Sequence, residues 1–288
     1  MIVRTAGHGG TERCLSPEYT QCPAAKQLHE ELPSQARCPF LQESLVQYCS
    51  SAPVTTYIPY TESLLSRCLS GRFRYCGLYL AMAHPEHPGT RSAAEEVEGI
   101  PVPSRLCYTR NHLWLDVCED GACAIGIDGL LAHVLASVDK VTYLTTKGTA
   151  RPSAVLAVRG LEIQVAFPAM VQLTGVNPSL RTDPGKLIAD PYGLGWMFEG
   201  SDPRPAGRGA APLTGGLLRG TEAREWMRDE YHRMSAFIHE VLARPGAAGA
   251  RIMNDGGLIG RDALQGLSPE EVIALCNEFF SLYASLGR

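Results

Sequence analysis

The feature that most constrains the fold is a series of short alternating apolar runs in the middle of the chain. Between residues 113 and 176 lie LWLDV, ACAIGI, KVTYL, AVLAV, LEIQVAF and MVQLTGV, separated by Asp-Gly, Lys-Gly, Arg-Gly and proline. Closely spaced runs with a period of two are typical of short antiparallel strands. One helical insert is expected over 129–137. This region is therefore predicted to be a small, mostly antiparallel β domain.

The regions on either side differ from it in composition. Pro, Gly and charged residues indicate a linker over 84–104, and Gly, Pro and Ala indicate a second one over 204–219. Beyond it, Thr221 is expected to cap a helix that ends at Leu242, and Ser268-Pro269-Glu270-Glu271 has the pattern of a capping box with proline at the first helical position. The chain is thus predicted to have an α+β fold, in this order: an irregular segment over 1–33, a cysteine-rich module over 34–83 with helical pieces at 42–48 and 62–67, the linker over 84–104, the β domain over 105–203, the linker over 204–219, and a helical region over 220–288.

Composition excludes several classes of protein. Hydrophobic residues make up 45% and charged residues 19%, which is ordinary globular usage. A net charge of −4 gives no electrostatic reason to expect a nucleic-acid partner. The sequence shows neither an apolar run long enough to cross a membrane nor the apolar core of a signal peptide. We therefore expect a cytoplasmic protein with no nucleic-acid or membrane partner.

Two groups of motif residues frame the β domain. The first group opens with Tyr108, Thr109, His112 and Trp114 and continues in the next strand, which enters a short helix, with Ala124, Gly126 and Ile127. The second group lies at the far end of the domain and leads its last strand; it consists of Val176, Asn177, Asp183, Pro184, Asp190, Pro191, Tyr192, Gly193, Gly195 and Trp196. Both groups resemble the glycine cleavage system H proteins, which open on Tyr-Thr-x-x-His-x-Trp and close on Asp-Pro-Tyr-Gly-x-Gly-Trp. The resemblance covers 108–203.

This resemblance implies a barrel-sandwich hybrid like that of lipoyl and biotinyl carriers, which is a flattened barrel or sandwich with a protruding hairpin. In the family, the hairpin tip presents a lysine in Glu-Ser-Val-Lys-Ala, whose amide-linked lipoate visits partner enzymes. The matching hairpin here is AVLAVRGLEIQV, and counting back from Pro168 and Asn177 puts the acceptor position at Gly160, preceded by Arg159. Glycine has no side chain, and a guanidinium stays protonated and is a poor acyl acceptor. Ala157 replaces the acidic residue, so we expect no lipoate.

The four lysines of the chain all lie outside this hairpin. They are Lys26, Lys140, Lys147 and Lys186. Lys147, in TTKGT, is the nearest alternative acceptor at a turn.

Ten cysteines are unusual for a cytoplasmic protein of this size. Cys68 and Cys76 have seven residues between them, as do Cys14 and Cys22, and both pairs begin with Arg-Cys-Leu-Ser. We interpret Cys38, Cys49, Cys68 and Cys76 as one four-thiolate metal module and the earlier pair as a truncated second copy. Four thiolates suit zinc or a [4Fe–4S] cluster. The alternatives are disulfides or buried reduced thiols.

Other candidate residues carry weaker hypotheses. His84 and His87 are either accessory metal ligands or solvated linker residues, and His112 and Trp114 are expected to pack inside the β domain. On the helix after Thr221, a polar face is expected to be solvated, while an apolar stripe packs on the core or mediates dimerisation; the face holds Asp229, Glu230, His232 and His239, and the stripe holds Trp226, Tyr231, Met234, Phe237 and Ile238. No catalytic motif is visible in the sequence, so no catalytic residue is predicted.

Two hypotheses for function follow. The first is a non-enzymatic scaffold or regulatory protein, with a metal-binding cysteine module, that docks a protein partner through the H-like domain. The alternative is a carrier or electron-transfer component of an enzyme complex that uses an iron–sulfur cluster. The sequence does not determine the oligomeric state.

Overall fold

The computed structural model describes residues 47–49, 51, 56–58, 68, 71–83, 96–203, 213–243, 259–260, 263–280 and 283–286. The chain divides into two compact units, 1–66 and 67–288. The described residues of the first unit form one antiparallel pair, β1 (Gln47–Cys49) and β2 (Thr56–Ile58), with Tyr48 opposite Tyr57. Gln47 and Tyr48 therefore lie in a strand and not in the helix predicted over 42–48. The helical piece predicted over 62–67 lies outside the described residues.

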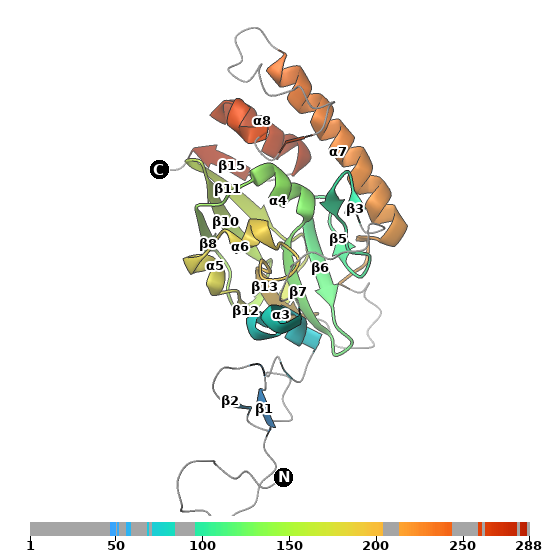
Figure 1. The fold of residues 1–288 in the computed structure, drawn as a ribbon, viewed down its shortest axis with the longest axis vertical. Coiled ribbons are helices and arrows are strands. Elements are labelled where there is room, and N and C mark those ends of the chain that lie inside the picture. The colour runs from blue at the N-terminus through green and yellow to red at the C-terminus, as the bar shows by residue number, and fades with distance from the viewer. Residues whose placement is uncertain are drawn as a thin grey trace, which may run out of the picture. The chain divides into compact units, whose positions relative to one another are not determined.

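Two antiparallel sheets form the body of the second unit (Figure 1). The seven-stranded sheet has the order β14-β5-β6-β7-β13-β12-β9 and consists of β5 (Cys107–Tyr108), β6 (Leu113–Val117), β7 (Ala122–Ile127), β9 (Gly148–Ala150), β12 (Val171–Val176), β13 (Phe198–Ser201) and β14 (Leu218–Arg219). The four-stranded sheet has the order β15-β11-β10-β8 and consists of β8 (Lys140–Tyr143), β10 (Ser153–Val158), β11 (Leu161–Ala166) and β15 (Tyr283–Leu286). A separate hairpin pairs β3 (Glu96–Val97) with β4 (Ile100–Pro101).

The prediction of a mostly antiparallel β domain is confirmed, because every strand pairing among the described residues is antiparallel. Neither sheet closes on itself within the described strands, so the arrangement is two open sheets and not a barrel. Both sheets contribute to one hydrophobic core: Leu156 and Ile163 come from the four-stranded sheet, and Leu115 and Ile125 come from the seven-stranded sheet.

The strands show two burial patterns with different causes. In β11, Leu161, Ile163 and Val165 are buried and alternate with more exposed residues, as expected for a strand with one apolar face. In β7 every residue is buried. One reason is that the 3-10 helix η3 (Gly71–Tyr75) packs on β7, and Tyr75 stacks on Trp114 with ring centroids 5.8 Å apart. Residues 71–75 and the helix α3 (Gly77–Ala83) after them belong to the same compact unit as the β domain.

The helices agree with most of the sequence predictions. The expected insert is α4 (Gly129–Leu135), which ends two residues before the predicted end. The helix α8 (Pro269–Phe279) has the predicted capping box: the Ser268 hydroxyl accepts from the Glu271 amide, and the Glu271 carboxylate accepts from the Ser268 amide. Two single-turn helices, α5 (Ser179–Thr182) and α6 (Lys186–Ala189), lie between β12 and β13.

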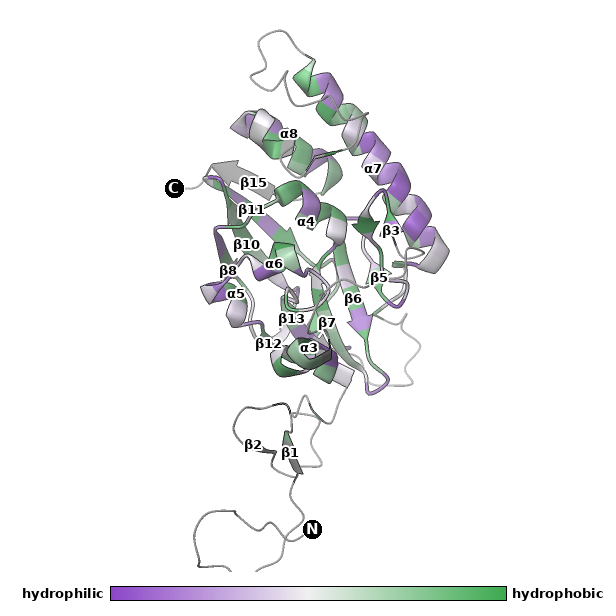
Figure 2. Cartoon of the chain, viewed as in Figure 1, coloured by the Kyte–Doolittle hydropathy of each residue, from purple (hydrophilic) through white to green (hydrophobic). Residues whose placement is uncertain are grey.

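The start of α7 (Gly220–Leu242) differs from the prediction. Thr221 lies inside the helix instead of capping it, and the N-cap is Arg219, whose side chain makes no capping hydrogen bond. The reason is that β14 runs directly into the helix through Gly220, which has a φ of +51° that glycine adopts without strain. The predicted apolar stripe packs on the core, because Tyr231, Met234 and Ile238 are buried. Figure 2 shows that hydrophilic and hydrophobic residues both occur along α7.

In the described parts of the chain, no helix combines the length and apolar composition that a membrane span requires.

Candidate functional site

The turn between β5 and β6 places a histidine inside the protein. The Thr109 hydroxyl donates to the Leu113 carbonyl over 3.1 Å and accepts from the Leu113 amide over 2.9 Å. Within this loop His112 has a φ of +61°, a backbone conformation that is uncommon outside glycine. The conformation is held from both sides, because the His112 amide donates to the Thr109 carbonyl and the His112 carbonyl accepts from the Asp128 amide. The imidazole is consequently fully buried.

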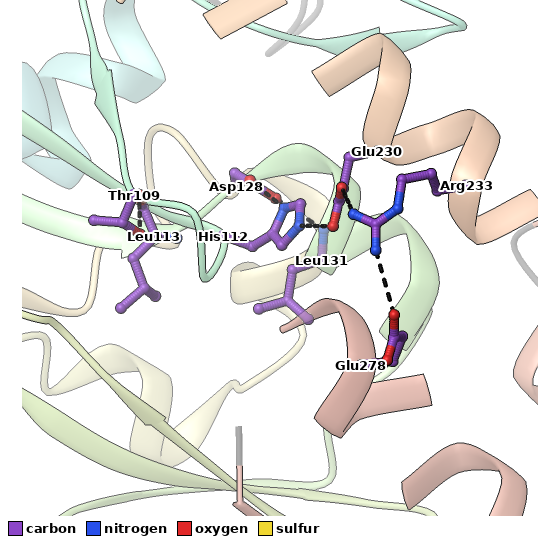
Figure 3. Close-up of polar contacts among 8 residues, drawn as sticks. All are labelled: Thr109, His112, Leu113, Asp128, Leu131, Glu230, Arg233 and Glu278. Carbon is purple, nitrogen blue, oxygen red and sulfur yellow. Dashed lines mark hydrogen bonds and ion pairs between the residues drawn. The ribbon is translucent and has the colours of Figure 1, made fainter. Parts of the chain in front are cut away.

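His112 forms the centre of a buried charge network (Figure 3). Its Nδ1 lies 2.7 Å from Oδ2 of Asp128, which is itself fully buried. The other oxygen of Asp128 caps α4 by accepting from the Leu131 amide over 2.9 Å. On the opposite side of the ring, Nε2 lies 3.9 Å from Oε1 of Glu230 on α7, which is an ion-pair distance and too long for a hydrogen bond. Among the described residues, Nε2 has no hydrogen-bond partner.

The network continues into the C-terminal helices. The Arg233 guanidinium donates to Glu230 over 2.6 Å and to Glu278 of α8 over 3.3 Å. The His112 ring also lies 4.9 Å from the rings of Trp226 and Phe280, measured between centroids. These contacts join the β5–β6 turn, α4, α7 and α8.

The electrostatics favour a charged imidazole. Burial alone would lower the pKa of His112, but the adjacent Asp128 carboxylate, with help from Glu230, outweighs burial and raises the pKa to about 9. Burial alone would raise the pKa of Glu230, but its contacts with His112 and Arg233 hold it below the ordinary value. Since both His112 and Asp128 are fully enclosed, the cluster is suited to anchoring the helices and not to proton transfer with a substrate.

The prediction of a solvated polar face on α7 is wrong for Glu230, which is 6% exposed. Glu230 shares a face with Met227 and Met234, and this face packs against the β domain. The prediction is confirmed for His232, whose side chain is 61% exposed and lies 3.8 Å from Glu98. His239 makes a local contact in which its Nδ1 lies 2.8 Å from the Ser235 carbonyl.

The closing motif of the matched segment ties the backbone together. The Trp114 indole donates to the Pro191 carbonyl over 3.0 Å, and the Tyr192 hydroxyl donates to the Pro101 carbonyl over 2.8 Å. The Asn177 amide donates to the carbonyls of Leu194 and Trp196, each over 2.8 Å. The motif residues therefore connect the two ends of the domain.

The hairpin tip has a different construction. Arg159 and Gly160, with φ values of +51° and +80°, form the two-residue turn between the paired Val158 and Leu161. Positive φ at both central residues is the geometry of a type I′ turn. The Arg159 amide donates to the Asp139 carboxylate over 2.9 Å, and its guanidinium donates to the Leu264 carbonyl in the 3-10 helix η5 (Ala263–Gly266).

The C-terminal extension, which consists of α7, η5, α8 and β15, covers this hairpin with its last elements. Strand β15 pairs with β11 from Leu161, opposite Leu286, to Gln164, opposite Tyr283. The outer edge of β11 is therefore paired up to the residue that follows the turn. Figure 1 shows β15 beside β11 and α8 next to them. Of the possible acceptors elsewhere, Lys147 is exposed in the loop between β8 and β9.

The predicted metal ligands are only partly described. Cys49 in the first unit is half-buried; in the second unit Cys68 is exposed and Cys76 is half-buried; all three are free thiols. Cys38 lies outside the described residues, as do Cys14, Cys22, His84 and His87. Within the described ranges, no group of three or more His, Cys, Asp or Glu side chains is arranged to hold a metal ion. The four-cysteine metal site therefore stays a prediction.

The remaining cysteines behave as small apolar residues. Cys107, Cys118, Cys123 and Cys276 are buried free thiols. Burial raises the pKa of Cys123 and of Cys276 to about 12, so both are protonated at neutral pH.

Sequence reasoning did not identify most of the charge network. Asp128 had a usable signal, because an aspartate directly before the helical insert is a standard N-cap. Glu230 and Glu278 had none, since their roles depend on how α7 and α8 pack on the β domain. The burial of His112 was expected, but its ionic partners were not.

Comparisons with known proteins identify relatives of the middle of the chain. No protein-family model matches. The glycine cleavage system H protein of a Psychrobacter species is 32% identical over 101 residues, which are 34% of this chain and 79% of that protein. The H protein of Neisseria meningitidis is 28% identical over 109 residues, which cover 36% of this chain and 84% of the relative. The crystal structure of the Mycobacterium marinum H protein aligns with a TM-score of 0.36 at 22% identity, covering 43% of this chain and 97% of that one. Because the chain spans 79% of a relative to which it is 32% identical, it belongs, through about a third of its length, to the glycine cleavage system H protein family.

Proposed function

We propose that this protein is an H-protein-like scaffold that docks a protein partner without carrying lipoate. The observation that carries the proposal is the β10–β11 turn, where Arg159 and Gly160 occupy the position that the family resemblance assigns to the acceptor lysine. A carrier needs a primary amine at an exposed tip. Glycine offers no side chain, and the guanidinium is neither nucleophilic nor free, since it donates to the Leu264 carbonyl.

The C-terminal extension gives independent support. An enzyme that attaches lipoate would have to bind the hairpin from outside, but β15 pairs with the outer edge of β11 and η5 contacts the turn. A lipoyl arm at this turn would also need space in which to swing. The network of His112, Glu230 and Arg233 also anchors the extension at a distance from the tip. The extension is therefore held both at the hairpin and at this network.

The family residues that this chain retains support the proposal of a protein partner. The relatives are named as components of the glycine cleavage system, and the resemblance implies a domain that docks on partner enzymes. In this chain the residues that build the domain's frame, such as Trp114 and Asn177, keep complete hydrogen bonding. A docking surface that depends on the frame can therefore survive the loss of the acceptor.

The N-terminal cysteines complete the proposal. We assign Cys38, Cys49, Cys68 and Cys76 to a zinc or [4Fe–4S] site on the strength of their number and spacing in the sequence. Zinc would make the site structural. A cluster would favour the alternative function, a carrier or electron-transfer component.

The proposal that the chain carries no lipoate is tested by intact-mass analysis of the full chain co-expressed with a lipoate-attaching enzyme and lipoate. A lipoylated H protein from a relative serves as the positive control, and the variant Lys147→Arg checks the exposed lysine in the loop between β8 and β9. We expect the unmodified mass for the wild type and for the variant. A gain of one lipoyl group by the wild type would refute the proposal, and its loss in Lys147→Arg would locate the site.

The metal hypothesis is tested on protein purified without oxygen. Stoichiometric zinc and no visible absorbance would support the scaffold. Broad visible absorbance that bleaches reversibly at a defined potential would favour the electron-transfer alternative. Protein free of both metals would contradict the assignment of the four cysteines.

A further inference from the structure

A hollow lies between the hairpin tip and the C-terminal extension. Its empty space, together with the open solvent at its mouth, is about 330 Å³, and it is lined by Val158, Arg159, Leu161, Leu264, Leu267, Pro269 and Val272. Six of these seven residues are apolar, and the seventh carries a guanidinium. An apolar hollow with a single charged group is the usual construction of a site for a small amphipathic ligand.

The lining comes from elements that are fixed in place. Val158 and Leu161 are paired residues of the hairpin, Leu264 belongs to η5, and Pro269 and Val272 lie in the first turns of α8. Buried side chains supply most of the walls, because Val158, Leu161, Leu264 and Val272 are each at most 4% exposed. The walls are therefore formed before any ligand arrives.

Arg159 supplies the only charge in this lining. Its backbone is fixed by the left-handed turn and by the hydrogen bond that its amide donates to the Asp139 carboxylate. One guanidinium N–H donates to the Leu264 carbonyl. A guanidinium has five N–H donors in a planar fork, so the others can bind the two oxygens of a carboxylate.

The size of the hollow limits the ligand. Because the 330 Å³ includes open solvent at the mouth, the enclosed space holds clearly fewer than the roughly ten water-sized groups that about 30 Å³ each would give. A short alkyl chain of about four to six carbons, with its end in the mouth, is therefore the appropriate length. Alkyl groups fit the six apolar residues, and the carboxylate fits the guanidinium.

We propose that the hollow at the hairpin tip binds a short aliphatic carboxylate, with the alkyl chain against Val158, Leu161 and Val272 and the carboxylate on Arg159. Binding is non-covalent and reversible. This proposal goes beyond the scaffold role and does not require it, since the hollow lies in a part of the chain that needs neither lipoate nor metal.

The binding test uses the full chain with labelled Val and Leu methyl groups and sodium hexanoate as the probe, followed by nuclear magnetic resonance. We expect saturable shifts of the Val158, Leu161, Leu264 and Val272 methyls. From butanoate to hexanoate, affinity should rise about threefold to fourfold for each methylene that is buried. Hexan-1-ol and hexylamine should bind at least about tenfold more weakly, because they lack the charge-assisted hydrogen bonds. Absence of saturable shifts at these methyls, or equal binding of hexylamine, would overturn the proposal.

Two variants separate the charge from the cavity. Arg159→Gln should weaken hexanoate binding at least about tenfold, whereas Arg110→Gln, a change at an exposed arginine on another turn, should not alter it. Val272→Phe fills the hollow and should abolish binding while Arg159 remains. The unfolding midpoint of each variant shows whether the extension stays docked. Undiminished binding by Val272→Phe would place the ligand elsewhere and refute the assignment.

Discussion

The buried corner around His112 and the hairpin tip around Arg159 belong to the same matched segment, but they are built on different principles. At the corner the side chains determine the structure: His112 pairs with Asp128, and Asp128 caps α4. At the tip the backbone does so, because a two-residue turn needs only positive φ at both positions. A fold can therefore keep its frame residues while the residues at the tip change chemistry.

The C-terminal extension contacts each region in a corresponding way. At the corner it adds a charged group, Glu230, to a preformed pair. At the tip it adds a strand, β15, whose contact with β11 is backbone pairing. Substitutions should therefore lower the free energy of unfolding strongly at the corner and only slightly at the tip, and this difference can be tested.

The largest effect is expected for Asp128→Ala. The substitution leaves the His112 imidazolium buried without its closest counter-ion and removes the N-cap of α4, so the free energy of unfolding should fall by about 3–5 kcal/mol. Urea unfolding measures it, with His232→Ala on the exposed face of α7 as the control, expected to change stability by less than about 0.5 kcal/mol. Equal effects of the two variants would contradict the ionic account of the corner.

The second effect is a dependence of stability on pH. The pKa of His112 rises from 6.5 to about 9 on folding, so the folded state holds the proton more tightly than the unfolded state. The resulting stabilisation, on the order of 3 kcal/mol, is fully present below pH 6.5 and is lost as the pH rises through 9. Chemical unfolding at a series of pH values should show this decline in the wild type. His112→Gln should lack it, and an identical decline in that variant would assign the titration to another group.

A third test contrasts Gly126 of β7 with Gly77 of α3. A Cβ on Gly126 would lie 2.7 Å from the Trp114 ring, whereas a Cβ on Gly77 would meet nothing closer than Leu194 at 3.9 Å. Gly126→Ala should therefore cost about 1–3 kcal/mol by overpacking, and Gly77→Ala, in the first turn of α3, should be neutral or stabilising. Calorimetric midpoints compare them. A neutral Gly126→Ala would show that the indole can move aside.

The smallest effect is expected at the tip. A Cβ on Gly160 meets nothing within 4 Å, so Gly160→Ala should lose only about 1 kcal/mol, through the strain of a φ of +80°. The unfolding midpoint should fall less than for Gly126→Ala. A larger loss would mean that the tip, like the corner, depends on side-chain packing.

Local patterns in the sequence were sufficient to predict much of the fold. The alternating runs predicted the strands β6, β7, β8, β10, β11 and β12, and the Ser268 to Glu271 pattern predicted the cap of α8, because each signal lies within a few residues. The missed features are contacts between distant segments. The pair of His112 with Glu230 spans the β domain and α7, and the pairing of β15 with β11 joins the chain end to a hairpin. No local periodicity encodes such contacts.

The central claim is that the hairpin is covered by the chain's own C-terminal extension. Hydrogen exchange on the full chain, resolved at the amides of β11, tests it most directly. If β15 occupies the outer edge of β11 from Leu161 to Gln164, the amides of this stretch that point away from β10 should exchange as slowly as those of β10, which lies inside the sheet. Fast exchange of these outward amides, as on an unpaired edge strand, together with slow exchange in β10, would contradict the account and leave the tip open.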